Sequence, residues 1–422
     1  MPAAPSRVRA ALLLFFATAA TLGLAMAVPG SSVLVVLAVR ASHLPLGVIG
    51  TAIAAMSAGM IVSLVSGGAL VDRFGPRSLA ATASTALTSA LLWWAVAPPA
   101  ALLGLAIRVA LLGLCAGPLG MAIARAVFSA FPPRQRGLAM GIRQTGVPLG
   151  VALAAAAWPP LVPRIGTAGA LEWTAAVVWI AGMALALLAG RSPRSKAGQA
   201  GAVRAAAPWS RLAAPLGVHL LLAAGQFNLV AYGMVYLHSV DRIPLALAGR
   251  LLALAQGGGA VMRIAGGWWS DRRGGARAPL LGVLSASGMV LFAVLAAAQR
   301  LPVLTAALAF FALGMATTGW NGVALTWAGE TAGAAAGLGM GMAATAVYLG
   351  GTVFPPAFGA VVAAHGYRAG WAGLAVVYGL ATVIALRAAS TGPVAQPRRL
   401  AGSGCRHNTQ ATASSTSGGG RK

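Results

Sequence analysis

Two arginines, Arg143 and Arg263, lie inside long apolar stretches of the sequence, about one to two helical turns from one end of each stretch. A bare cation in hydrocarbon costs roughly 2.5–3.5 kcal/mol, so each must face a partner or a wet cavity. The chain has five acidic residues, and none falls in the middle of an apolar stretch. Because a guanidinium group binds oxyanions in a bidentate manner, the pair predicts contact with an anionic ligand. The alternative is that each arginine reaches back to water or binds helix carbonyl groups.

Further polar and aromatic residues accompany these arginines in the apolar stretches. Gln256 precedes Arg263 by seven residues and therefore shares its helix face. The segment 319–322, GWNG, interrupts another stretch with small and polar residues, where the backbone is expected to loosen around a ligand. The candidate substrate-binding residues are Arg143, Arg263, Gln144, Gln226, Asn228, Tyr232, Gln256, Trp320, Asn321 and Tyr348. Amides and tyrosines also form ordinary contacts between helices, and this alternative stays open.

The elements that must position these residues are membrane helices. Of the 422 residues, 59% are hydrophobic and only 8% are charged, whereas about a quarter of a soluble domain is charged. Apolar runs of about 20 residues or more recur along the chain, and that length crosses about 30 Å of hydrocarbon. We predict an all-α membrane protein with twelve transmembrane helices, at 9–38, 44–71, 78–97, 100–130, 138–160, 171–190, 214–238, 243–270, 278–298, 301–329, 334–363 and 369–388.

The placement of positive charge predicts how the chain is oriented. Of the 30 Lys and Arg residues, 20 fall on the predicted inner side, five on the outer side and five inside spans. Loops rich in Lys and Arg stay in the cytoplasm, so we predict a multi-pass inner-membrane protein with both termini cytoplasmic. The net charge of +25 is therefore not read as a nucleic-acid partner. The first span also resembles a signal peptide, with Ala25-Met26-Ala27 as a cleavage-like site; we expect it to be retained, since its removal would leave an odd number of spans.

Two segments recur about 200 residues apart. Residues 68–77, GALVDRFGPR, correspond to 267–277, GWWSDRRGGAR. Residues 137–150, GLAMGIRQTGVPLG, correspond to 337–350, GLGMGMAATAVYLG, with eight of fourteen positions identical. The repeat predicts a duplicated six-helix unit with the substrate held between the two copies.

The repeat also divides the chain into predicted domains. These are an N-terminal six-helix bundle at 1–190, a cytoplasmic linker at 191–213, a C-terminal six-helix bundle at 214–388 and a disordered cytoplasmic tail at 389–422. Arg143 and Arg263 stand opposite Ala343 and Leu64 in the repeat, so they break its symmetry. Repeated positions hold the fold, and ligand residues are better sought where the halves differ.

The loop at 68–77, with its weaker copy at 267–277, resembles the G-x-x-x-D-R-x-G-x-R signature of the major facilitator superfamily. The resemblance covers residues 8–390 and implies two pseudo-symmetric six-helix bundles that meet at helices 5 and 8. It also implies a gate, in which glycines let helices 2 and 11 approach and an aspartate accepts hydrogen bonds from a helix N-terminus. The gating candidates are Gly68, Asp72, Arg73, Gly75, Arg77, Gly267, Asp271, Arg272 and Arg277. The alternative is that they only fix topology.

Weaker local resemblances bear on the substrate. Residues 141–150 and 319–322 are similar to the cyanate and nitroimidazole branch of that superfamily, and 263–267 to helix 8 of oxalate–formate and monocarboxylate carriers. We predict a secondary active transporter of a small organic or inorganic anion, working by alternating access. A proton-coupled drug or metabolite exporter is the alternative, since 146–150 partly resembles an antiporter motif and His219 and His238 can titrate. A receptor or scaffold that no longer transports is a third reading.

The sequence gives no sign of catalysis. Cys115 and Cys405 are the only cysteines, and their positions offer neither a disulfide framework nor metal spacing. No set of acid, base and nucleophile converges in a chain so poor in carboxylates. We therefore expect no enzyme activity, metal or cofactor, and a monomer whose partners are a small-molecule substrate and the lipid bilayer.

Overall fold

The computed structural model describes residues 7–30, 47–99, 101–190, 209–298 and 300–390, and in these ranges it is helical without strands. The elements are α1 (Arg7–Ala27), α3 (Gly47–Val96), α4 (Leu102–Ala130), the short 3₁₀ helix η1 (Pro133–Gln135), α5 (Arg136–Gln144), α6 (Gly146–Leu188), α8 (Trp209–Ser239), α9 (Leu245–Arg272), α10 (Arg277–Ala297), α11 (Val303–Thr318), α12 (Asn321–Ala332), the 3₁₀ helix η2 (Gly333–Ala335) and α13 (Ala336–Ser390). All of these belong to one compact unit that ends at Thr391.

Three long helices are broken by a glycine with positive φ. Gly75 has φ 82° in α3, Gly166 has φ 73° in α6 and Gly366 has φ 78° in α13. Only glycine adopts this backbone region readily, so the chain reverses at these positions. Gly166 and Gly366 stand 200 positions apart, which places a third pair of corresponding residues at the offset of the sequence repeat.

The described part of the chain contains twelve helical spans. In this count the pieces on either side of each of these glycines are separate spans, while α5 and the first part of α6 form one span, as do α11 and α12. Eight described stretches meet a criterion of length and hydropathy for crossing a membrane, two of which merge several spans. The helix α9 is not among these stretches. The twelve-helix, all-α prediction is therefore confirmed for the described residues.

Some helix boundaries in the described residues differ from those predicted. The first helix ends at Ala27 with a turn at 28–30, and the rest of the predicted span 9–38 lies outside the described residues. The predicted span 138–160 ends inside α6, because the chain reverses later, at Gly166. Of the predicted linker 191–213, residues 209–213 are helical and belong to α8, while 191–208 and the tail from 391 lie outside the described residues.

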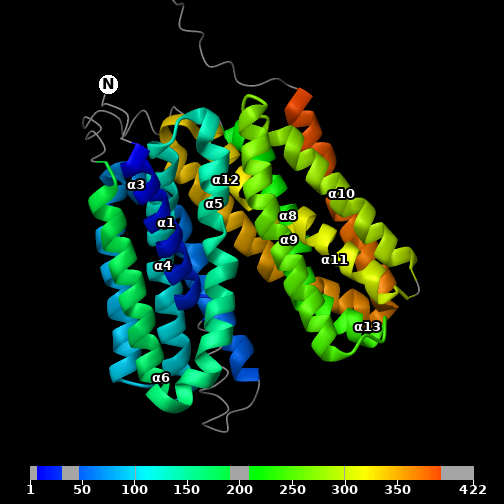
Figure 1. Ribbon diagram of the computed structural model, residues 1–422, viewed down its shortest axis with the longest axis horizontal. Coiled ribbons are helices and arrows are strands. Elements are labelled where there is room, and N and C mark those ends of the chain that lie inside the picture. The colour runs from blue at the N-terminus through cyan, green and yellow to red at the C-terminus, as the bar shows by residue number, and fades with distance from the viewer. Residues whose placement is uncertain (1–6, 31–46, 100, 191–208, 299, 391–422) are drawn as a thin grey trace, which may run out of the picture. The chain divides into compact units, whose positions relative to one another are not determined.

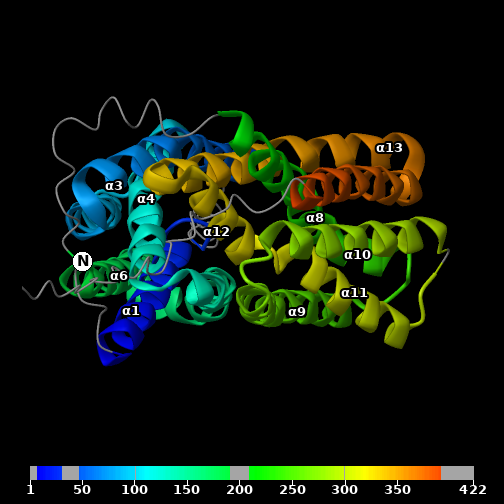
Figure 2. The same cartoon turned by 90° about the horizontal axis from the view of Figure 1, so that it is seen from above.

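Buried apolar side chains form two clusters. One is built from α1 to α6, with additional residues from α12 and the start of α13. The other is built from α8 to α13 and contains the fully buried Trp320, Trp371 and Tyr378. Figures 1 and 2 show the helices of each cluster running side by side. Each sequence repeat therefore has a core of its own, which holds its polar residues at fixed positions.

The first set of helices, α1 to α6, contacts the second set, α8 to α13, mainly through five elements. The helix α5 contacts α9 and α12, and α3 contacts α13. The term inner end is used below for the end that carries 72–77, 131–135 and 272–276, which the arginine distribution predicts to face the cytoplasm. The contacts of α5 with α9 and α12 lie in the inner parts of the helices, because α5 forms only the inner piece of the span that α6 continues.

Candidate functional site

Two helices are interrupted where they meet in the interior. The helix α5 ends at Gln144 and α6 begins at Gly146, while α11 ends at Thr318 and α12 begins at Asn321. Each interruption leaves a carbonyl without its usual helical donor. For Gln144 the reason is in the sequence, because the residue four positions on is Pro148, which has no N–H.

Arg263 of α9 binds both of these carbonyl groups. Its side chain is 4% exposed; Nε donates to the Thr318 carbonyl at 3.0 Å and Nη1 donates to the Gln144 carbonyl at 2.7 Å. Gln144 belongs to the first set of helices and Thr318 to the second. The guanidinium group therefore joins the two sets at the point where both helices are broken.

Glycines make this close approach of helices feasible. A Cβ atom on Gly141 of α5 would collide with the carbonyl oxygen of Arg263, and one on Gly322 of α12 would lie within 2.9 Å of the backbone of Gly141. The absence of side chains lets α5, α9 and α12 cross with their backbones in contact.

Arg143 of α5 is also 4% exposed and lies beside the Arg263 site. Its Nε donates to Thr21 Oγ1 of α1 at 3.3 Å, while its Nη1 is buried and has no hydrogen-bond partner among the described residues. Arg143 directly precedes Gln144, whose carbonyl binds Arg263, so the two arginines are neighbours. Among the described residues, no salt bridge from either arginine to a carboxylate exists.

An amide pair continues the network on the side of the second bundle. Asn321 Nδ2 donates to Gln226 Oε1 of α8 at 2.8 Å and to the Thr318 carbonyl at 3.2 Å. The Thr318 carbonyl therefore accepts from both Asn321 and Arg263. The structure thus connects Gln226, Asn321, Arg263 and Gln144, with Arg143 adjacent, which is half of the residues proposed from the sequence.

The other five predicted residues have different surroundings. Tyr232 donates to the Pro355 carbonyl at 2.9 Å, and Asn228 donates to the Ala224 carbonyl of its own helix at 2.9 Å. Trp320 is fully buried, donates to the Thr317 carbonyl at 2.6 Å and meets His219 edge to face. Tyr348 packs against the first core from α13, and Gln256 is half-buried on α9. In the described chain no hydrogen bond joins these five to Arg263.

The two signature aspartates form a second cluster at the inner end. Asp72 of α3 accepts hydrogen bonds from the amides of Gly337 at 3.0 Å and Leu338 at 2.9 Å, at the start of α13. A Cβ atom on Gly68 would collide with the Gly337 backbone, so the helices touch there. The carboxylate sits on the positive end of the α13 dipole, and Arg125 Nε lies 3.3 Å away.

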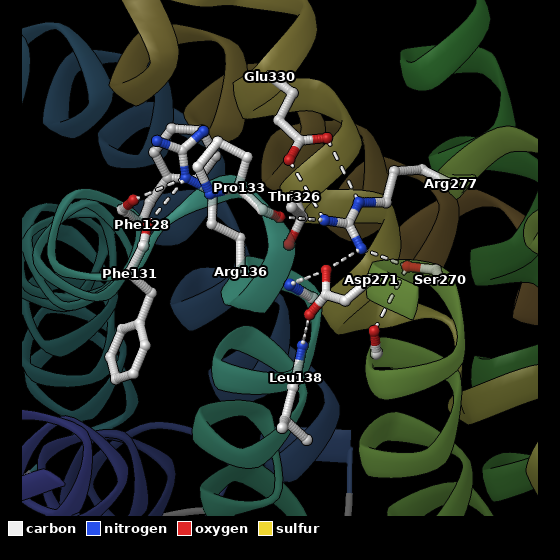
Figure 3. A network of polar contacts seen from close by, with 12 residues as sticks. Phe128, Phe131, Pro133, Arg136, Leu138, Ser270, Asp271, Arg277, Thr326 and Glu330 are labelled. Carbon is white, nitrogen blue, oxygen red and sulfur yellow. Dashed lines mark hydrogen bonds and ion pairs between the residues drawn. The ribbon is translucent and has the colours of Figure 1, made fainter. Parts of the chain in front are cut away.

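The repeat produces the same arrangement at Asp271 (Figure 3). Its carboxylate accepts from the amides of Gly137 at 3.0 Å and Leu138 at 2.8 Å, near the start of α5, and pairs with Arg277 Nη1 at 2.6 Å. The two aspartates therefore cross over, since each binds a helix of the opposite set. In this conformation the inner ends of the two sets are held together.

Arg277 is the centre of the second cluster. Its side chain is 2% exposed and binds Glu330 through Nε and Nη2, both at 3.3 Å, with a further hydrogen bond from Nη1 to Ser270. It also donates to the Pro133 carbonyl of η1 at 3.3 Å, so it spans the two sets. Figure 3 shows Glu330, Asp271 and Ser270 around the guanidinium group.

The signature arginines Arg73 and Arg272 each contact an aromatic ring of their own helix. Arg73 lies over the ring of Phe74 at 5.2 Å, and Arg272 lies over the ring of Trp268 at 4.1 Å, both on their own helices. Sequence reasoning missed Arg125 and Glu330 as members of the inner clusters. Glu330 could have been found, because an acid at the inner end of an arginine-rich protein is expected to have a basic partner.

Known proteins can now be compared with this arrangement. The family model described as Major Facilitator Superfamily matches residues 10–355. Uncharacterized MFS-type transporters of two Mycobacterium tuberculosis strains, H37Rv and CDC 1551, are 33% and 32% identical over 329 and 337 residues, in each case 77% of this chain and 73% of the relative.

Solved structures share the fold at low identity. An Escherichia coli fucose:proton symporter variant has TM-score 0.72 and 14% identity, covering 90% of this chain and 98% of that one. The human organic anion transporter MFSD10 has TM-score 0.69 and 17% identity, covering 90% of this chain and 100% of that one. With its twelve spans, the crossed aspartate contacts and these matches, the chain belongs to the major facilitator superfamily, the family of multi-pass membrane transporters for small solutes.

Proposed function

We propose that this transporter moves a small organic or inorganic anion across the cytoplasmic membrane by alternating access. The observation that carries the proposal is the pair Arg143 and Arg263, two cations at 4% exposure whose hydrogen-bond partners among the described residues are neutral oxygen atoms. Burying an ion is costly unless it is paired. An anionic substrate would supply the missing charge.

Arg263 also suggests how binding is coupled to movement. The substrate anion competes with the Gln144 and Thr318 carbonyls for the guanidinium hydrogens, because an anionic oxygen adds the attraction of an ion pair, which a neutral carbonyl lacks. Once Arg263 turns to the substrate, its hydrogen bond to Gln144 between the two sets of helices is lost. The crossed Asp72 and Asp271 contacts then remain as the inner gate, and breaking them opens the site to the other side.

The same proposal includes the predicted topology. Both termini lie in the cytoplasm, residues 1–190 and 214–388 act as the two moving bundles, and the protein works as a monomer. The arginine distribution supports this orientation. The two named structural relatives handle a sugar and an organic anion by their titles, and at this level of identity they support the fold alone.

Counterflow in proteoliposomes tests the substrate class. Labelled cyanate, nitrite and short mono- and dicarboxylates would be compared with neutral and cationic drugs for wild type, Arg263→Gln and Arg263→Lys. A lost charged hydrogen bond is worth about 1.5–3 kcal/mol, so we expect anion flux to fall roughly 10- to 100-fold in Arg263→Gln. Arg263→Lys keeps the charge but loses the two-point geometry, so a partial defect is expected.

Arg250→Gln is the matched control, since Arg250 lies exposed on the same helix. Equal monodispersity and thermal unfolding of the variants would exclude misfolding as the cause. If cationic drugs were transported, anions were not, and Arg263→Gln had no effect, the proposal would be rejected in favour of a proton-coupled exporter. If no solute moved in any variant, a receptor or scaffold would be the better reading.

A further inference from the structure

A pocket of about 520 Å³ opens at the inner end, beside the Asp271 cluster. It is lined by Arg134 of η1, which belongs to the first set of helices, and by Asp271, Arg272 and Gly274 of the second set. Its volume falls within the roughly 300–1,000 Å³ of typical small-ligand sites. Gly274 has φ 72° and open space where a Cβ atom would lie, so no side chain fills this wall.

The charge around the pocket is not balanced by the protein. Asp271 already accepts two amide hydrogens and pairs with Arg277, and Glu330 is bound by the same Arg277. The entire chain has only five acidic residues. Asp72 pairs with Arg125. Glu172 lies shortly after the reversal at Gly166 in α6, and Asp241 lies in the turn between α8 and α9, both away from the inner end. No carboxylate is therefore left to neutralise Arg134 and Arg272.

The side chain of Arg272 is held in place by a tryptophan at the expected level of the membrane surface. Its guanidinium group lies 4.1 Å from the ring centroid of Trp268, which is 44% exposed. Arg273 and Trp269 repeat this stacking at 5.0 Å on the next positions of the chain. Exposed tryptophans gather where lipid headgroups meet water. The pocket thus combines a fixed cation, a second cation from the opposite set and access from the headgroup region.

We propose that this pocket binds a phosphate-bearing anion, held between Arg134 and Arg272. Guanidinium groups bind phosphate oxygens in a bidentate manner, and two of them compensate the charge of a phosphate. The source is either the headgroup of an anionic phospholipid or a free phosphate from the cytoplasm. Because the two arginines come from opposite sets of helices, the bound anion bridges them next to the Asp271 contact and stabilises the conformation with the inner end closed.

Binding to purified, delipidated protein tests this directly and does not depend on knowing the transported solute. Native mass spectrometry would count adducts of phosphatidylglycerol and of phosphatidylcholine, and calorimetry in detergent would measure inorganic phosphate. We expect Arg134→Gln and Arg272→Gln each to weaken binding about fivefold, and the double variant about 25-fold, which corresponds to about 1 kcal/mol for each basic residue near a membrane surface.

Arg273→Gln is the matched control, because it removes the same charge one position along but does not line the pocket. Arg134→Lys and Arg272→Lys keep the charge but lose the two-point geometry, so each should weaken binding less than the corresponding Gln variant, which separates a lost ligand contact from a folding defect. Phosphatidylglycerol binding alone assigns the site to lipid, and phosphate binding alone assigns it to a free anion. Binding of neither, or equal loss in Arg273→Gln, would overturn the proposal.

Discussion

Replacing Asp271 by Asn should open the inner end of the protein. The aspartate Oδ1 accepts from the Gly137 amide and pairs with Arg277, and Oδ2 accepts from the Leu138 amide. Asparagine keeps one acceptor, removes the charge and places an NH₂ group against an amide donor. Its partner Arg277 is 2% exposed and would then be only partly compensated by Glu330.

The magnitude follows from this burial. Removing one partner of a buried ion pair typically costs about 3–5 kcal/mol. If the open conformation exposes Asp271 to water, the entire loss falls on the closed conformation. The equilibrium between the two would then shift by roughly 100- to 5,000-fold towards the open state, at 1.4 kcal/mol for each factor of ten.

Asp72→Asn provides an internal comparison with the same local contacts. The Asp72 and Arg125 side chains are 10% and 22% exposed and 3.3 Å apart, against 4% and 2% and 2.6 Å for Asp271 and Arg277. Solvent screens the first pair more effectively, so its removal should cost less, about 1–2 kcal/mol. The structure therefore predicts that both variants open the inner end and that Asp271→Asn does so more than Asp72→Asn.

Double electron–electron resonance can measure the opening. Spin labels on Ser129→Cys and Arg387→Cys, both exposed and on opposite sets of helices, would report the distance between inner ends. Cys115 and Cys405 would first be replaced. We expect a new, longer distance in Asp271→Asn and a smaller fraction of it in Asp72→Asn. An unchanged distribution in Asp271→Asn, or a larger effect in Asp72→Asn, would refute this account of the gate.

Three further predictions concern single positions. Gly141→Ala should disfavour the closed conformation by about 1–3 kcal/mol, because its Cβ meets the Arg263 carbonyl, whereas Gly257→Ala, in open space, should not change the label distances. Pro148→Ala supplies an amide donor that competes for the Gln144 carbonyl, so solute flux should fall; unchanged flux would count against Arg263 acting through Gln144. Burial raises the pKa of Asp241 from its ordinary 3.8, opposed by the Leu301 amide. The folded protein then holds a proton that the unfolded chain has released, so the free energy of unfolding falls as pH rises above 3.8, and Asp241→Asn should raise Tm more at pH 7 than at pH 4. An equal change in Tm at both pH values would contradict this assignment.

The sequence alone determined the fold class and the family signature at 68–77. Twelve apolar runs, the arginine bias and the repeat are local or periodic properties, and each can be seen in the letters. Gly68 likewise signalled close helix approach, because a small residue at the end of an apolar run allows backbones to touch. The helix break at Gly319-Trp320 could also be expected, since glycine and a polar amide interrupt that run.

Only the tertiary structure decided which residues share a site. It joins Arg263 to Gln144 and Thr318, residues 119 and 55 positions away, and pairs Asp72 with Arg125 and not with an arginine of its own signature. It also gave Trp320 a buried role against His219. Spacing in a sequence predicts which face of a helix a residue occupies, but not the rotation and crossing of helices that pack far apart in the chain. Those are fixed by the collective packing of both cores, and with them the partners of every buried charge.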